Sequence, residues 1–202
     1  MKVAIIGAGE MGRWFTKFFS EAGIPVMISD KDEQRLSKIR KEFGVEIGDN
    51  KNVVKSADIV MICVPVEHFV SVMKEINSYV RSDQMVIDIC TVKNFPVRAM
   101  HKYVKNGMTL GSHPMFGPDV KSIKYQNVIL TPTNSKEEML AKKFKDLLEK
   151  QQAKVFIMSP EKHDKFMNLI FRLPRGAAFF LYHTNKRLPS VLSIAYRLLS
   201  II

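Results

Sequence analysis

The sequence predicts an α/β fold in which a doubly wound, mostly parallel sheet is followed by a short all-helical C-terminal segment. Strand-like apolar runs alternate with amphipathic helix patterns from the N-terminus to about residue 158. Such alternation with short connections is typical of an open sheet covered by helices on both faces. After Met158 only helical patterns remain. We therefore expect one domain at residues 1–158 and a helical segment at 159–202.

The expected strands are short runs rich in Val, Ile and Leu, as is typical of buried parallel strands. A glycine or proline follows some of them, as Gly7 follows the first and Pro65 follows the fourth. The runs lie at residues 3–6, 24–29, 45–47, 58–64, 85–89, 109–112, 127–130 and 155–157.

The expected helices have apolar residues spaced three or four apart, which places them on one buried face. These patterns cover residues 11–22, 32–43, 69–76, 96–104 and 140–148. Ser159 as a cap and Pro160 at the first helical position mark the start of the C-terminal segment. The stretch 190–202 is strongly apolar, so it must be buried against the domain, another subunit or further sequence.

Composition and charge place the chain among folded globular proteins. Hydrophobic residues make up 46% and charged residues 25% of the sequence. The net charge of +11 suits nucleic acid, an anionic surface or an anionic small molecule. Lysines spread over helix faces without an aromatic stripe argue against nucleic acid and favour a solvated face or an anionic small molecule. No apolar run approaches the roughly 18 residues of a membrane span, so we expect no membrane partner.

The two cysteines, Cys63 and Cys90, lie in apolar runs and have no spacing typical of a metal site. Buried free thiols fit a reducing compartment. We therefore expect a cytoplasmic protein without a bound metal.

A glycine-rich turn directly follows the first expected strand and opens a helix. It has the GxGxxG pattern: Gly7-Ala8-Gly9-Glu10-Met11-Gly12. The first glycine permits a tight turn, the second lets a pyrophosphate approach, and the third lets helix and strand pack closely. The helix N-terminus offers N–H groups and a positive dipole end to phosphates. The turn predicts a Rossmann-type domain that binds a nicotinamide dinucleotide.

Asp30 bears on the choice of cofactor. It ends the second expected strand, where a carboxylate accepts a hydrogen bond from a ribose 2′-hydroxyl and repels a 2′-phosphate. This position favours NAD. Lys31 and Arg35 are nearby cations that keep NADP open.

Two further segments place chemically useful side chains at the carboxyl edge of the sheet, where doubly wound folds bind ligands. In the first, Asp88–Lys93, we expect the Thr91 hydroxyl and the Lys93 amine to be presented at this edge. The second is GSHPMFGP, residues 111–118, in which His113 follows a strand. A histidine fixed there suits general acid–base catalysis, and the alternative is a surface-loop histidine.

These segments resemble the prephenate and arogenate dehydrogenases of the tyrosine pathway. GSHPMFGP is similar to the HPM-containing signature of the family, and DICTVK, residues 88–93, is similar to its D-x-x-S-V-K segment. The GxGxxG turn and the Val64-Pro65 turn fit the same pattern. SPEKHD, residues 159–164, resembles the PE-x-HD that begins the family's helical second domain.

The resemblance implies NAD-dependent oxidative decarboxylation of prephenate to 4-hydroxyphenylpyruvate. The residue matching His113 accepts the proton of the ring hydroxyl. The residue matching Thr91, a serine in the family, supports that histidine and the substrate hydroxyl. The family's second domain also implies a homodimer formed through the C-terminal helices. The expected cofactor contacts are Gly7, Gly9, Glu10, Met11, Gly12, Asp30, Val64 and Pro65.

Departures from the family pattern concern the substrate. Where the family has S-H-L-P-H, this chain has FRLPR, residues 171–175, with arginine in both histidine positions. Arg175 would pair with a carboxylate of a dianionic substrate, and Ser112 is the second candidate substrate contact. The family's helical domain also continues beyond the length seen here. Two alternatives therefore stay open: a dinucleotide-binding module without turnover, and a Rossmann dehydrogenase of the β-hydroxyacid or imine-reductase type.

Overall fold

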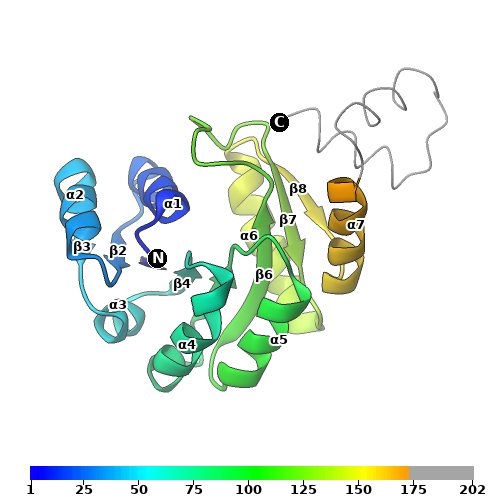
Figure 1. Ribbon diagram of the computed structural model, residues 1–202, viewed down its shortest axis with the longest axis horizontal. Helices are drawn as coiled ribbons and strands as arrows, with labels where there is room; N and C mark the ends of the chain where they lie inside the picture. The colour runs from blue at the N-terminus through cyan, green and yellow to red at the C-terminus, as the bar shows by residue number, and fades with distance from the viewer. Residues whose placement is uncertain (173–202) are drawn as a thin grey trace.

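The computed structural model describes residues 1–172, with side chains through Leu169, and shows one eight-stranded sheet covered by helices on both faces (Figure 1). The strands are β1 (Val3–Ile6), β2 (Val26–Ser29), β3 (Glu46–Ile47), β4 (Ile59–Ile62), β5 (Met85–Asp88), β6 (Met108–Pro114), β7 (Asn127–Thr131) and β8 (Lys154–Ile157). The helices are α1 (Glu10–Glu21), α2 (Glu33–Phe43), α3 (Asn50–Ser56), α4 (Val66–Ile76), α5 (Asn94–Tyr103), α6 (Ser135–Lys150) and α7 (Pro160–Arg172), with a short 3-10 turn η1 (Asn77–Tyr79).

The strand order is β3-β2-β1-β4-β5-β6-β7-β8. Neighbouring strands pair in parallel, except that β6 and β7 are antiparallel. This confirms the doubly wound, mostly parallel fold. The order reverses between β1 and β4, whose following helices α1 and α4 cover opposite faces. Ligands of such sheets bind in the crevice at this switch point.

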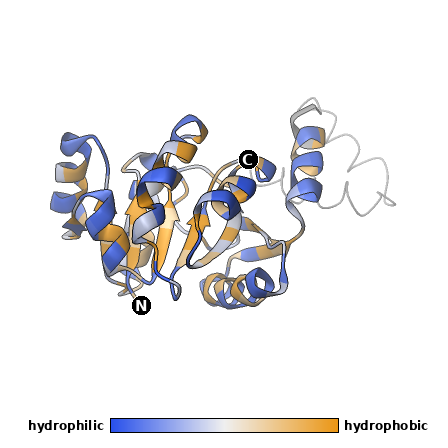
Figure 2. Ribbon diagram, turned by 90° about the horizontal axis from the view of Figure 1, so that it is seen from below, coloured by the Kyte–Doolittle hydropathy of each residue, from blue (hydrophilic) through white to orange (hydrophobic). Residues whose placement is uncertain are grey.

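The sheet has two cores because successive strand side chains point to opposite faces. On one face Phe19 of α1 and Phe144 of α6 pack on the strands. On the other face the packing comes from Phe69 of α4 and Met100 of α5. Figure 2 shows apolar strands between helices whose outer surfaces are hydrophilic. These cores hold the strand ends in place and so define the carboxyl edge of the sheet.

Two differences between the structure and the sequence-based expectation bear on the site. Helix α3 was not expected, because it is short; the side chain of Asp49 caps it by accepting from the N–H of Asn52. Strand β6 extends to Pro114, whereas we expected it to end at Ser112. His113 therefore lies inside the strand, opposite Ile129 of β7, and not in a loop.

Helix α7 follows the sheet and packs on its β7–β8 end, as Figure 1 shows. Phe166 and Met167 are buried against Ile129 of β7 and lie beside Phe156 of β8. The start of the helical segment is thus seen, while residues 173–202 lie outside the described part. Within that part, no helix is both long and apolar enough to cross a membrane.

Candidate functional site

A cleft of about 1020 Å³ opens at the carboxyl ends of β1, β4 and β5. Thr91 and the cations Lys31 and Arg35 line it. The structure also brings together there most of the residues predicted to contact a cofactor, namely Gly7, Gly9, Glu10, Met11, Asp30, Val64 and Pro65. Gly12, the remaining predicted residue, is buried behind the turn.

Each glycine of the turn has a distinct steric role. Gly7 has a positive φ of 108°, and a Cβ there would lie 2.5 Å from the carbonyl oxygen of Cys63. A Cβ on Gly12 would lie 1.8 Å from the carbonyl oxygen of Gly7. A Cβ on Gly9 would meet nothing within 4 Å, so this position faces open space. Gly7 and Gly12 are needed by the fold, and Gly9 leaves room for a ligand.

Two helix N-termini at this cleft have no side-chain cap. Helix α1 begins after Gly9 and helix α4 after Pro65, and neither residue forms a capping side-chain hydrogen bond. In contrast, α2, α3 and α6 are capped by the side chains of Asp32, Asp49 and Asn134. The first N–H groups of a helix need partners, and a helix N-terminus attracts anions. The cleft can therefore hold a phosphate group at these N-termini.

Asp30 links the glycine turn to the start of α2. One carboxylate oxygen accepts from the backbone N–H of Ala8, and the other accepts from the N–H of Asp32 at 2.8 Å. The carboxylate thus steadies the turn while it borders the cleft. Arg35, which also lines the cleft, pairs with Asp32 at 3.1 Å.

Lys93 does not present its amine at the edge of the sheet, as we had expected from the sequence. Its side chain is fully buried and forms an ion pair with the buried Asp88. The ammonium also donates to the carbonyl oxygen of Ser112 in β6. The Ser112 hydroxyl donates back to the carbonyl oxygen of Asp88 at 2.9 Å. These bonds join the segment after β5 to the end of β6.

His113 is buried, with 6% of its surface exposed, and its ring contacts a second histidine. His113 Nδ1 lies 2.9 Å from Nε2 of His163, and His163 Nδ1 lies 2.8 Å from a carboxylate oxygen of Asp164. His163 and Asp164 belong to α7, fifty positions further along the chain. Sequence reasoning assigned them no role, although the HD of the PE-x-HD segment was a signal that could have found them.

The surroundings of His113 keep its imidazole neutral. Burial, with smaller contributions from the neighbouring His163 and Lys93, lowers the pKa of His113 to about 3, while Asp164 acts in the opposite direction. Burial also lowers the pKa of His163. A neutral imidazole keeps one nitrogen lone pair, so it can accept a proton. His113 is therefore in the unprotonated state that a general base requires at neutral pH, and the same burial makes its imidazole a weak base.

The other predicted site residues have different placements. His113 and Ser112 are not among the residues that line the cleft, whereas Thr91 is. Ser112 is buried with its hydroxyl engaged. Arg175 lies outside the described residues. Among the residues that the structure describes, no group of three or more His, Cys, Asp or Glu side chains is arranged so that it could hold a metal ion.

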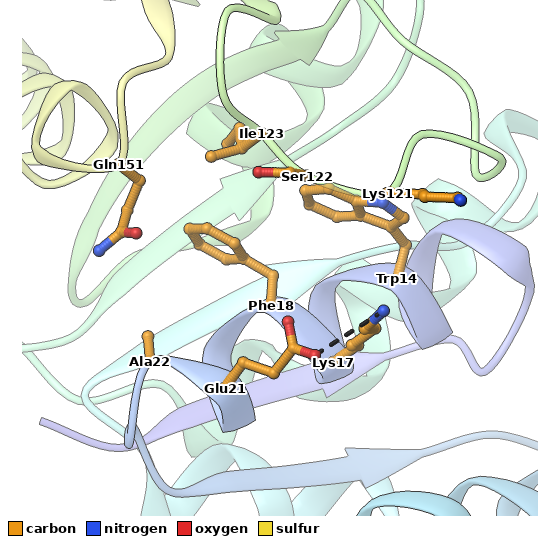
Figure 3. A pocket seen from close by; sticks show the side chains of 9 residues that line it. All are labelled: Trp14, Lys17, Phe18, Glu21, Ala22, Lys121, Ser122, Ile123 and Gln151. Carbon is orange, nitrogen blue, oxygen red and sulfur yellow. Dashed lines mark ion pairs between the residues drawn. The ribbon is translucent and has the colours of Figure 1, made fainter.

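A second hollow, of about 230 Å³, lies between α1 and the loop after β6 (Figure 3). Trp14 stacks on Phe18 at 5.6 Å and contacts Phe116 at 4.8 Å between ring centroids. The indole N–H of Trp14 donates to the carbonyl oxygen of Val120 at 2.6 Å. This aromatic cluster fixes the loop after His113 onto the helix that begins at the glycine turn.

Comparison with known proteins places this geometry in a family. Residues 15–157 match the family model described as the nucleotide-binding domain of prephenate dehydrogenase. The chain belongs to the prephenate dehydrogenase family. A probable arogenate/prephenate dehydrogenase of Methanocaldococcus jannaschii is 35% identical over 192 residues, which are 93% of this chain and 43% of that protein. The chain therefore spans less than half the length of this relative.

Solved structures of the family share the fold. Prephenate dehydrogenase from Aquifex aeolicus, in complex with hydroxyphenyl propionate and NAD+, superposes with a TM-score of 0.76 at 25% identity. The alignment covers 98% of this chain and 78% of that one. Synechocystis arogenate dehydrogenase gives the same TM-score and coverage at 16% identity, which supports the fold alone.

The buried, neutral His113 predicts a pH-dependent stability. The unfolded chain binds a proton at this residue below about pH 6.5, but the folded chain binds it only below about pH 3. The stability from a neutral His113 is therefore complete above pH 6.5 and is lost as the pH falls toward 3. Between pH 7 and pH 5 we expect this residue to lower the free energy of unfolding by about 2 kcal/mol.

Urea unfolding at the two pH values measures this loss. The His113→Asn variant should lose about 2 kcal/mol less than the wild type over the same interval. If both proteins lost the same free energy of unfolding between pH 7 and pH 5, a lowered pKa of His113 would be contradicted.

Proposed function

We propose that this chain is a dehydrogenase that carries out NAD-dependent oxidative decarboxylation of prephenate to 4-hydroxyphenylpyruvate, or the corresponding reaction of arogenate, in tyrosine biosynthesis. The observation that carries the proposal is a buried, neutral His113 at the carboxyl edge of a nucleotide-binding sheet. A base in that place suits the removal of a hydroxyl proton while a hydride leaves the same carbon. The names and ligands of the family members above support the same chemistry.

The cleft fits a dinucleotide by its own features. Gly9 and the uncapped N-terminus of α1, with Glu10 and Met11, would hold the pyrophosphate, and Gly7 and Gly12 shape the turn. Asp30 would accept from the adenosine ribose, and Val64 and Pro65 would border the cofactor further along the cleft. When bound, NAD+ supplies the acceptor for the hydride. Since a carboxylate at Asp30 repels a 2′-phosphate, we propose NAD over NADP, with Lys31 and Arg35 reducing the preference.

The residues of this chain handle the proton and the substrate charges. His113 accepts the proton of the ring hydroxyl as the hydride leaves, and the Thr91 hydroxyl supports the same oxygen. Loss of carbon dioxide returns its bonding electrons to the ring, and the ring oxygen takes the proton back from His113. Ser112 and Arg175 are the proposed substrate contacts. An anionic substrate suits the net charge of +11.

We also propose that the protein is cytoplasmic, with the domain boundary after residue 158, and that it forms a homodimer through its C-terminal helices. The strongly apolar sequence of residues 190–202 supports the dimer, because so many apolar side chains have to be buried and a second subunit can bury them. Light scattering at micromolar concentration should give the mass of two chains. A stable monomer under these conditions would contradict the dimer.

Replacing Gly9 by Ala should weaken cofactor binding without unfolding the protein. The new methyl enters open space in the free protein, but it occupies the place where the pyrophosphate would approach. We expect the Kd for NADH, measured by fluorescence titration, to rise at least about tenfold, a loss of about 1.4 kcal/mol. NADPH should bind the wild type more weakly than NADH.

Gly117→Ala is the matched control, because a Cβ on Gly117 also meets nothing within 4 Å and this residue does not line the cleft. Its Kd for NADH should equal that of the wild type. Unchanged binding by the Gly9→Ala variant would argue against a pyrophosphate at this turn.

Replacing His113 by Asn should remove turnover while preserving cofactor binding. Loss of a general base lowers kcat by about a hundredfold or more. The measurement is NADH absorbance with prephenate and, separately, with arogenate. His101→Asn is the control, since His101 lies on α5 beside Glu137 and away from the cleft.

Three results separate the hypotheses. Turnover that survives His113→Asn would favour a Rossmann dehydrogenase of another type. NADH binding without turnover of either substrate would favour a dinucleotide-binding module, which the arginines of residues 171–175 also suggest. Turnover lost only in His113→Asn supports the proposed reaction.

A further inference from the structure

A hydrogen-bonded row of three side chains connects the end of β6 to the beginning of α7. His113 Nδ1 lies 2.9 Å from His163 Nε2, and His163 Nδ1 lies 2.8 Å from Asp164 Oδ1. His163 is fully buried. We propose that His163 and Asp164 are positioning residues that fix the tautomer of His113, leaving its Nε2 free to accept a proton, and that they take up the positive charge formed during the reaction.

Asp164 is held as an ionised acceptor. Its carboxylate accepts from the backbone N–H groups of Lys93 at 2.7 Å and Asn94 at 2.9 Å, and from the side-chain amide of Asn94 at 2.8 Å. Burial alone would raise the pKa of Asp164, but hydrogen bonds from Asn94, His163 and Lys93 outweigh it and lower the pKa. A carboxylate without a proton only accepts hydrogen bonds. The Nδ1 of His163 must therefore carry the hydrogen that bonds to Asp164.

The same reasoning continues along the row to His113. A neutral imidazole carries one N–H, so His163 with its hydrogen on Nδ1 has a lone pair on Nε2. The hydrogen shared with His113 then belongs to His113 Nδ1. His113 Nε2 is left without a hydrogen, as a general base requires. The direction of every bond thus follows from the carboxylate at the far end.

The charges around His113 favour passing the proton along the row. Burial and the ammonium of Lys93 disfavour a cation at either ring, but of the two rings it is His163 that is hydrogen-bonded to the carboxylate of Asp164. The hydrogen on His113 Nδ1 can move to His163 Nε2, which leaves His113 neutral. The imidazolium formed at His163 then lies against Asp164. The reverse movement returns the proton when the ring oxygen needs it, so no proton is gained or lost overall.

The tautomer can be measured in the free protein without cofactor or substrate. Protein labelled with ¹⁵N at its five histidines is observed by NMR, and the His113 and His163 signals are assigned by their loss in single Asn variants. We expect hydrogen on Nδ1 and none on Nε2 in both rings. Hydrogen on Nε2 of His113 in the wild type would overturn the proposal, whether or not the Asp164→Ala variant folds.

Asp164→Ala tests the role of the carboxylate, since it removes the acceptor that orders the row. Both rings should then populate both tautomers. Asn94→Ala is the matched control, because it removes one donor to Asp164 but keeps the carboxylate, so the tautomers should be unchanged. An undisturbed His113 tautomer in Asp164→Ala would also overturn the proposal.

The kinetic part of the inference rests on the proposed function. In an active protein, Asp164→Ala should lower kcat at least about tenfold with KM changed by less than about twofold, because a positioned base acts on the chemical step. A wild type without turnover would count against the proposed function and leave the tautomer result standing. If the wild type is active and the Asp164→Ala variant has the same kcat, the positioning role of Asp164 would be overturned.

Discussion

The buried ion pair between Asp88 and Lys93 is the interaction on which the geometry of the site depends. Both side chains are fully buried, and the ammonium also holds the carbonyl oxygen of Ser112, the residue before His113. Breaking a buried pair by removing one partner costs about 3–5 kcal/mol, because the remaining charge has no partner. The backbone N–H of Lys93 donates to Asp164 as well. The segment carrying Thr91, the strand carrying His113 and the helix carrying His163 therefore meet at one lysine.

The cleft lies at two helix N-termini that have no side-chain cap. Helices α2, α3 and α6 each begin with a side-chain cap, and α5 takes its cap from Asp164. The N-termini of α1 and α4, which both face the cleft, begin without one. Unpaired N–H groups at a helix start favour an anionic partner. The switch between β1 and β4 brings these two starts together, so the topology creates the binding site before any catalytic residue is added.

The sequence predicted the features that depend on local rules. The glycine turn and the position of Asp30 follow from short spacings, and the doubly wound, mostly parallel sheet follows from the alternation of strands and helices. The structure has this sheet and places the turn and Asp30 at the cleft. Contacts between distant residues were not predictable. The amine of Lys93 looked accessible because nothing local shows that Asp88 and Ser112 enclose it. His113 looked like a loop residue because glycines and prolines surround it, yet the antiparallel pairing with β7 holds it in a strand.

The row from His113 to Asp164 also shows why the nucleotide-binding unit is incomplete as a chemical site. The family match ends at residue 157, and His163 and Asp164 lie beyond it on α7. Without α7, the cleft and its glycine turn would remain, but Nδ1 of His113 would lose its acceptor and either ring nitrogen could carry the hydrogen. Because Phe166 and Met167 bury α7 against β7, apolar packing brings Asp164 to the start of α5. Docking of the helical segment therefore also decides which nitrogen of His113 carries the hydrogen.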